Sequence, residues 1–130
     1  MKKLLISLVA VITICACNTP VKEDSASSKQ VLRHVVLFEW ADSITDDKRD
    51  ELIEHFASLK DKIDVIKDFE YGSDVSVEGL AKGYSHCFIV TFEDEAARDI
   101  YLPHPDHKVF GDSVVPYLKN VLVVDYISNN

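Results

Sequence analysis

The segment VLRHVVLFEWA, residues 31–41, predicts a β-strand whose sheet must be covered on both faces. It is rich in β-branched and aromatic residues and is long enough for a strand of about ten residues. Side chains alternate across a strand, so the segment divides into two faces. The first face contains Leu32, His34, Val36, Phe38 and Trp40, and the second contains Val31, Arg33, Val35, Leu37 and Glu39.

A helix is predicted immediately after this strand. Residues 48–63 have an apolar stripe with spacings of four, three and four, which is typical of an amphipathic helix. Ser43 or Thr45 can cap its amino end. The stripe consists of Leu52, Phe56, Leu59 and Ile63.

Strand and helix patterns alternate along the rest of the chain. Further strands are predicted at residues 68–77, 84–93 and 121–127. Helical segments are predicted at residues 94–102 and 106–120, the second kinked at Pro116. The order β-α-β-β-α-β predicts an α+β fold of the ferredoxin-like type, with a four-stranded antiparallel sheet.

The second face of this sheet requires a partner. Two helical units cover one face only, whereas the last strand has the unbroken apolar run VLVV at residues 121–124. The same face of a second copy is the simplest cover, and two sheets packed in this way form a dimeric α/β barrel. A monomer with a half-solvated second face is the alternative.

The amino terminus predicts export and lipid attachment. Residues 1–17 (MKKLLISLVAVITICAC) combine two lysines with a short apolar run, as in a secretory signal, and the run is too short to cross a bilayer. Residues 14–17 resemble a bacterial lipobox, so we expect residues 1–16 to be a lipoprotein signal peptide and Cys17 to be acylated. A plain signal cleaved near Ala16 is the alternative. Asn18 after the anchor favours the outer over the inner membrane of a bacterial envelope, by resemblance only.

Residues 17–30 are polar and predict a flexible tether before a domain at residues 31–128. Removal of Lys2 and Lys3 with the signal changes the formal net charge from −8 to −10. Such a surface repels nucleic acid and anionic headgroups, so we expect membrane attachment through the acyl chains on Cys17 and no nucleic-acid partner. Cys87 would then be the single unmodified cysteine, either a buried apolar residue or a reactive thiol.

The segment YLPHPDHKVFGD, residues 101–112, contains the strongest candidates for chemistry. Pro105 suits a first helical turn, which places His107 near a helix amino end, where an extra positive charge is disfavoured. A neutral His107 can act as a general base, with Tyr101 orienting it or donating to an enolate oxygen. His34 and His86 can point into the same apolar-walled cavity, although each can equally be a satisfied core histidine.

Four motifs together resemble one family, the stress-responsive dimeric α-β barrel (Dabb) domains. The resemblance covers residues 32–127 and rests on HVVLFEW, GYSHCFIVTFEDEAA, YLPHPDH and VVDY, at residues 34–40, 83–97, 101–107 and 123–126. It implies a homodimeric ferredoxin-like barrel with largely unassigned, stress-linked biology. It also implies a possible relation to an enzymatic branch of small plant polyketide cyclases.

In that branch, residues similar to His34, His107 and Tyr101 act on a linear poly-keto substrate, which makes these three the catalytic candidates here. Two departures weaken the transfer of substrate and chemistry: Phe56 stands where a tyrosine lines the cyclase pocket, and the lysine common near the end of the first strand is absent. We expect a ligand pocket lined by Val36, Phe38, Trp40, Phe56, His86, Phe88 and Val90.

We predict no cofactor and no metal site. His104 and His107 have the spacing of two ligands on a helical face, but the prolines beside His104 oppose a helix there, and no further ligand is set by spacing. The sequence also contains no phosphate-binding glycine loop and no nucleophile elbow.

Three functions remain open. The first is a lipid-anchored dimer that binds a small, mostly apolar or aromatic molecule without turning it over. The second is an enzyme of the cyclase or cofactor-free oxygenase type with His107 as its base. The third is a structural, stress-protective assembly, because a fold alone does not determine a function.

Overall fold

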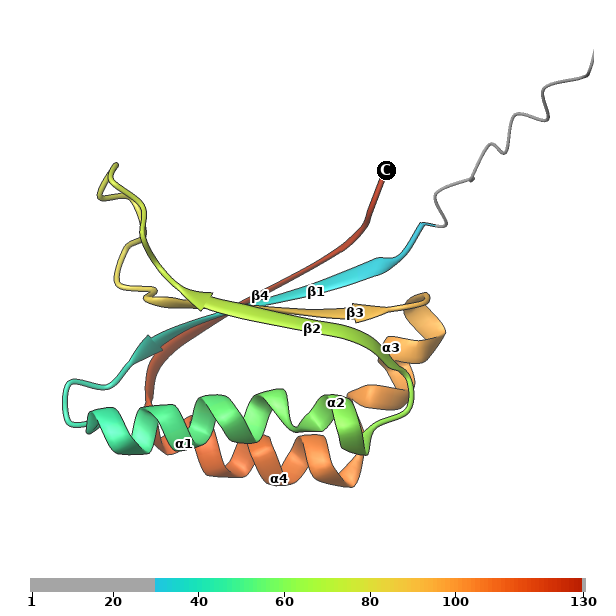
Figure 1. The fold of residues 1–130 in the computed structure, drawn as a ribbon, viewed down its shortest axis with the longest axis horizontal. Coiled ribbons are helices and arrows are strands. Elements are labelled where there is room, and N and C mark those ends of the chain that lie inside the picture. Colours follow the sequence, from blue (N-terminus) through green and yellow to red (C-terminus); the bar gives the residue numbers. More distant parts are fainter. Residues whose placement is uncertain (1–29, 130) are drawn as a thin grey trace, which may run out of the picture.

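A computed structural model describes residues 30–129, so the predicted signal peptide, Cys17 and nearly all of the predicted tether lie outside the described residues. Helices and strands follow one another in the predicted order (Figure 1). Their bounds are β1 Leu32–Trp40, α1 Asp46–Ala57, α2 Leu59–Lys62, β2 Ile66–Ser73, β3 His86–Phe92, α3 Glu95–Tyr101, α4 Pro105–Val114, η1 Val115–Tyr117 and β4 Leu118–Ile127.

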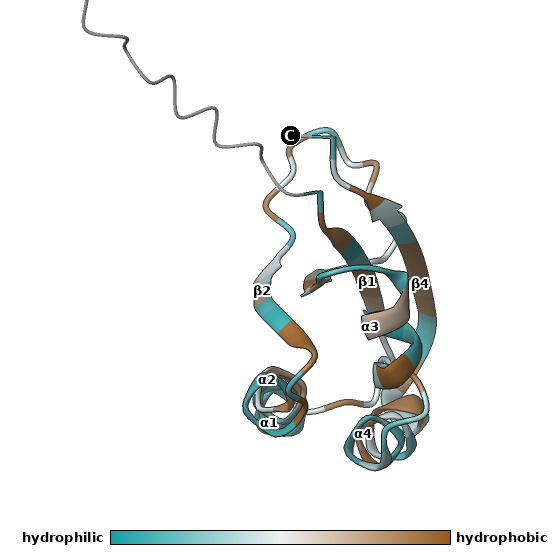
Figure 2. Ribbon diagram, turned by 90° about the vertical axis from the view of Figure 1, so that its right-hand side faces the viewer, coloured by the Kyte–Doolittle hydropathy of each residue, from teal (hydrophilic) through white to brown (hydrophobic). Residues whose placement is uncertain are grey.

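The four strands form one antiparallel sheet in the order β2-β3-β1-β4. One face of the sheet is covered by helices: α1 and α2 lie beneath the β2 side, and α4 lies beneath the β4 side (Figure 2). This arrangement confirms the predicted ferredoxin-like α+β fold. Thr45 is the residue that caps α1, through a side-chain oxygen 3.3 Å from the backbone N of Lys48.

The predicted division of β1 into two faces is confirmed. Its five even-numbered residues are buried against the helices, and the four between them are half-buried on the outer face. An aromatic cluster fills the space between sheet and helices, with Phe56 of α1 stacked on Phe110 of α4 at 4.3 Å between ring centroids. Burial of these rings stabilises the packing of α1 and α4 against the sheet.

Several predicted boundaries of strands and helices were wrong. The second strand ends at Ser73 instead of residue 77, because residues 74–85 form a long connection in which Gly79 and Gly83 adopt positive φ angles of 69° and 92°. The third strand is two residues shorter at its start. The last helix ends at Val114, and Pro116 lies in the 3₁₀ turn η1, so β4 begins at Leu118 instead of residue 121.

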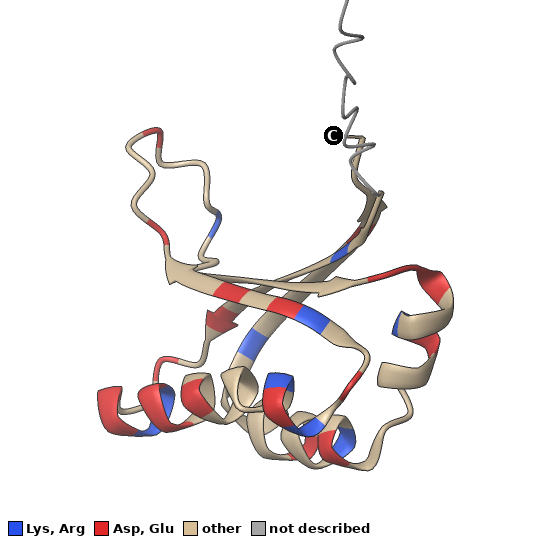
Figure 3. Ribbon diagram, turned by 45° about the vertical axis from the view of Figure 1, so that its right-hand side comes forward, with Lys and Arg blue, Asp and Glu red and all other residues tan. Residues whose placement is uncertain are grey.

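The outer face of the sheet is apolar and uncovered within the described chain. On β4, Leu122, Val124 and Tyr126 are 42%, 48% and 49% exposed, and their register places them beside β1 residues of the outer face. Together with Val35 and Leu37 they form a continuous apolar surface, which is unusual on a soluble monomer. Acidic residues are frequent along α1 (Figure 3), and Glu39 is the acidic residue of β1 on the outer face. No helix within residues 30–129 is both long and apolar enough to span a membrane.

Candidate functional site

A cavity of about 260 Å³ lies between the helix face of the sheet and helices α3 and α4. Most of its walls are apolar side chains from β1, β4, α1 and α4. Its polar groups include three rings, those of His34, Tyr101 and His107, so the structure brings the three catalytic candidates together. Three of the predicted pocket residues are part of its apolar lining: Val36, Phe38 and Phe56.

The turn between α3 and α4 positions His107. His104 is not helical, and it caps α4 with an Nδ1 that accepts a hydrogen bond from the Asp106 N–H at 3.2 Å. Pro105 occupies the first turn, as predicted, and His107 follows two residues later. His104 and His107 are therefore not two ligands on one helical face. Within residues 30–129 no group of three or more potential metal ligands is gathered at one point.

The hydrogen bond at Nδ1 fixes the tautomer of His107. Nδ1 lies 3.0 Å from the carbonyl oxygen of Leu102, and because a carbonyl only accepts, Nδ1 donates. In the neutral ring Nε2 is then free of a proton and able to accept one. Burial lowers the pKa of His107, despite the opposing effect of the Leu102 hydrogen bond. The ring is thus neutral at pH 7, chiefly because it is desolvated.

Tyr101 is completely buried and packs against both histidines. Its ring centroid lies 4.2 Å from that of His107 and 5.9 Å from that of His34. Burial raises the pKa of Tyr101 far above its usual range, so the hydroxyl keeps its proton. This hydroxyl has no hydrogen-bond partner among the described residues. An unpaired buried hydroxyl on a residue that lines a cavity is unusual in a folded protein.

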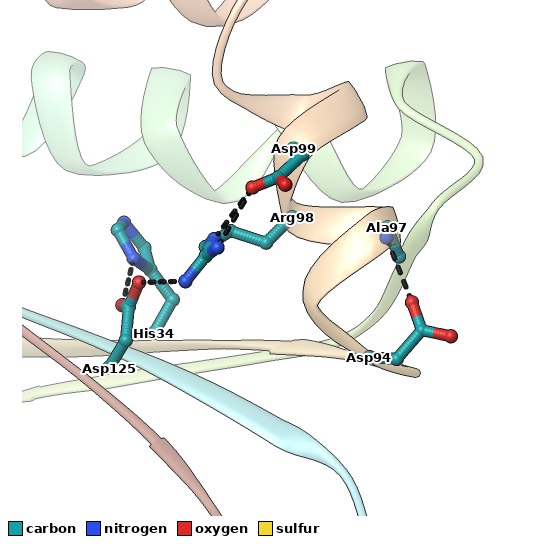
Figure 4. Close-up of polar contacts among 6 residues, drawn as sticks. All are labelled: His34, Asp94, Ala97, Arg98, Asp99 and Asp125. Carbon is teal, nitrogen blue, oxygen red and sulfur yellow. Dashed lines mark hydrogen bonds and ion pairs between the residues drawn. The ribbon is translucent and has the colours of Figure 1, made fainter.

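His34 is held by a carboxylate on the neighbouring strand. Its Nδ1 lies 2.6 Å from Oδ1 of Asp125, the residue paired with it in the β1–β4 register. The other oxygen of Asp125 lies 3.0 Å from Nη1 of Arg98, which also contacts Asp99 (Figure 4). Neither Asp125 nor Arg98 was predicted to have a role in the site. The available signal was Asp125 itself, the single charged residue in the apolar run VLVVDYI.

Four predicted pocket residues do not line this cavity: Trp40, His86, Phe88 and Val90. Trp40 and His86 pair with each other, since the indole N–H donates to Nδ1 of His86 at 3.0 Å. Phe88 and Val90 are fully buried. They share the helix face with His34, but β3 lies between β1 and β2, whereas the cavity lies towards β4. Sharing a face of the sheet was therefore not sufficient to predict a place in the pocket.

Residues 32–128 match the model of the stress responsive A/B barrel domain (Dabb) family. The chain is 39% identical over 99 residues to the stress-response A/B barrel domain-containing protein HS1 of Arabidopsis thaliana, covering 76% of this chain and 91% of that protein. It is 30% identical over 95 residues to olivetolic acid cyclase of Cannabis sativa, covering 73% and 94% of the two chains.

Solved structures agree with the family match. A crystal structure of an Arabidopsis thaliana protein superimposes with a TM-score of 0.73 at 38% identity, covering 76% of this chain and 96% of that one. A dimeric ferredoxin-like protein of unknown function from Jannaschia sp. superimposes with a TM-score of 0.63 at 29% identity, covering 74% and 97%. The dimeric state of such relatives supports a homodimer here. By fold and by sequence, the chain belongs to the Dabb family of stress-responsive A/B barrel domains.

Proposed function

We propose that the cavity binds a small, mostly apolar carbonyl compound and that His107 removes a proton from the carbon next to the carbonyl group. The proton passes from carbon to Nε2 of His107, and the electron pair of the broken C–H bond moves onto the carbonyl oxygen as an enolate. Tyr101 donates its hydroxyl hydrogen bond to that oxygen. If the enolate carbon attacks a second carbonyl group, the alkoxide that forms takes the proton from His107. Without such an attack, the α-carbon takes the proton back.

The observation that carries this proposal is the unpartnered hydroxyl of buried Tyr101, whose ring lies 4.2 Å from the ring of neutral His107 in the lining of the same cavity. A donor for an oxygen and an acceptor for a proton are the two groups that enolisation requires. The surrounding walls are apolar, and a dry site strengthens both interactions. One relative is named as a cyclase, and an enolate is the carbon nucleophile of a ring closure. Phe56 and the absent lysine argue against an identical substrate.

Hydrogen exchange on a carbonyl compound tests this chemistry directly. The full chain is incubated in D₂O with ethyl 3-oxooctanoate, and deuterium uptake at its α-carbon is followed by NMR above the spontaneous rate. We expect catalysed uptake that His107→Ala reduces by about 10²-fold or more, the usual contribution of a general base. His55→Ala is the matched control, since His55 is a half-buried histidine that does not line the cavity.

Binding without turnover is the second candidate function, and the predominantly apolar lining of the cavity favours it. Saturable binding of the ketoester, with no exchange above the spontaneous rate in the native chain, would select this function over the enzymatic one. Absence of both binding and exchange across a panel of carbonyl and polyphenolic compounds would favour a structural role.

We further infer that the domain is held at a bacterial envelope membrane by acyl chains on Cys17. The support is the lipobox-like sequence at residues 14–17 and the polar segment that follows it. Metabolic labelling with a radioactive fatty acid tests this. The native chain is expected to incorporate label and fractionate with membranes, while Cys17→Ser should do neither. Unlabelled native protein in the soluble fraction would contradict the anchor.

A further inference from the structure

A chain of charged contacts fixes the position of His34, and its members do not line the cavity. The Asp125 carboxylate bridges Nδ1 of His34 at 2.6 Å and Nη1 of Arg98 at 3.0 Å. Arg98 is fixed in turn by Asp99, whose Oδ1 lies 3.1 Å from Nε and 2.8 Å from Nη2 of the guanidinium. Figure 4 shows Asp125 between the imidazole and the guanidinium. Three elements, β1, β4 and α3, therefore meet at one carboxylate.

The carboxylate determines which nitrogen of His34 can serve the cavity. An ionised carboxylate only accepts hydrogen bonds, so Nδ1 of His34 carries the proton, and Nε2 is the remaining ring nitrogen. The Leu102 carbonyl imposes the same tautomer on His107. Two imidazoles that carry a proton on Nδ1 thus line the same cavity as Tyr101.

Arg98 fixes the orientation of the Asp125 carboxylate. Its guanidinium binds one oxygen at 3.0 Å, which leaves the other oxygen to contact Nδ1 of His34 at 2.6 Å. Asp99 contacts the same guanidinium from α3, with its own side chain 64% exposed. The other titratable groups beside His34 are Tyr101 of α3 and His107 of α4.

We propose that Arg98 is a positioning residue: by binding the second oxygen of Asp125, it keeps the other oxygen on Nδ1 of His34, so that Nδ1 carries the ring proton and Nε2 is the acceptor. The cavity then contains one donor, Tyr101, and two acceptors, His34 and His107. A ligand with a carbonyl oxygen for Tyr101 and a hydroxyl hydrogen for His34 satisfies both groups, and His107 remains free to take a carbon-bound proton. The part of this inference that concerns ligands rests on the proposed function, whereas the state of His34 does not.

Long-range ¹H–¹⁵N NMR of the histidine side chains tests the inference without a substrate. The ¹⁵N shifts of the full chain report tautomer and protonation for each ring between pH 5 and pH 9. We expect the neutral ring of His34 in the native chain to carry its proton on Nδ1. Arg98→Gln should increase the share of neutral His34 rings that carry the proton on Nε2, because Asp125 is then held less firmly, and Arg98→Lys should restore most of the native tautomer.

Arg49→Gln is the matched control, because Arg49 lies on α1 and acts electrostatically on His86, not on His34. It should move the His86 titration and leave His34 unchanged. The unaffected His55 signals report that each variant is folded. An unchanged His34 tautomer in Arg98→Gln, or a native His34 with its proton on Nε2, overturns the inference. Failure of ketoester exchange in the native chain would instead count against the proposed function alone.

Discussion

The hydroxyl of Tyr101 links stability and function at the level of one atom. Burying a hydroxyl without a partner costs free energy, which a protein retains only where the group has another use. Tyr101→Phe should therefore leave the free energy of unfolding unchanged or raise it by about 1 kcal/mol, while weakening ketoester binding or exchange. Urea unfolding and the exchange assay measure the two effects, with Tyr71→Phe as control, because Tyr71 is 52% exposed and does not line the cavity. A loss of more than about 1 kcal/mol in Tyr101→Phe would show that the hydroxyl is already bonded.

The depressed pKa of His107 predicts a pH dependence with a definite sign. Its ordinary pKa is 6.5, and burial lowers the pKa in the folded state, so below pH 6.5 the unfolded chain binds the proton more readily. The free energy of unfolding should thus fall as pH decreases from about 6.5 toward the folded-state pKa, and be level above that range. His107→Ala should flatten part of this slope in urea titrations at successive pH values. His86, whose pKa burial also lowers, should contribute to the same slope.

How far the site could be predicted from sequence depended on distance along the chain. Tyr101 and His107 are six residues apart, so their meeting at one turn followed from local helix signals. His34 joined them because strand alternation gave its face. Asp125 and Arg98 lie far from His34 in sequence, and only the β1–β4 register and the placement of α3 brought them into contact.

At the level of elements, helix α4 begins with an unusual N-cap residue, His104. A histidine replaces the common Ser, Thr, Asp or Asn, and its Nδ1 accepts the Asp106 N–H. His104→Ala should lower the free energy of unfolding by about 1 kcal/mol, and His104→Asn should restore most of it. Urea unfolding followed by circular dichroism provides the comparison. Equal loss in both variants would indicate that His104 acts through packing and not as a cap.

The elements themselves were predictable because apolar periodicity is a local property, whereas their ends were not. Residues 74–77 were predicted as strand from their valines, but in the structure Val75 and Val77 are 87% and 98% exposed on the β2–β3 connection. Turn chemistry at Gly79 and Gly83 outweighed strand propensity there. Likewise, Pro116 shortened the last helix, and the freed residues extended β4.

For the whole molecule, the outer face of the sheet determines how copies of the chain assemble. Leu122, Val124 and Tyr126 continue into a groove of about 570 Å³ bounded by Leu37, Cys87 and the β2–β3 connection. Exposed apolar residues on that connection extend the same surface. Because dimeric relatives share this fold, a second copy of the chain is the cover that fits.

Leu122→Asp tests this assembly, since the new carboxylate would be buried without a partner at the centre of the interface. We expect the native chain to sediment as a dimer at micromolar concentration, and Leu122→Asp to weaken the dimer by about 100-fold or more. Val109→Asp is the matched control, because Val109 is exposed on α4, on the opposite side of the sheet. Its dimer should be unaffected. A native chain that stays monomeric at this concentration, with its outer face wet, would contradict the barrel, and the cavity on the helix side would then have to function within a single copy.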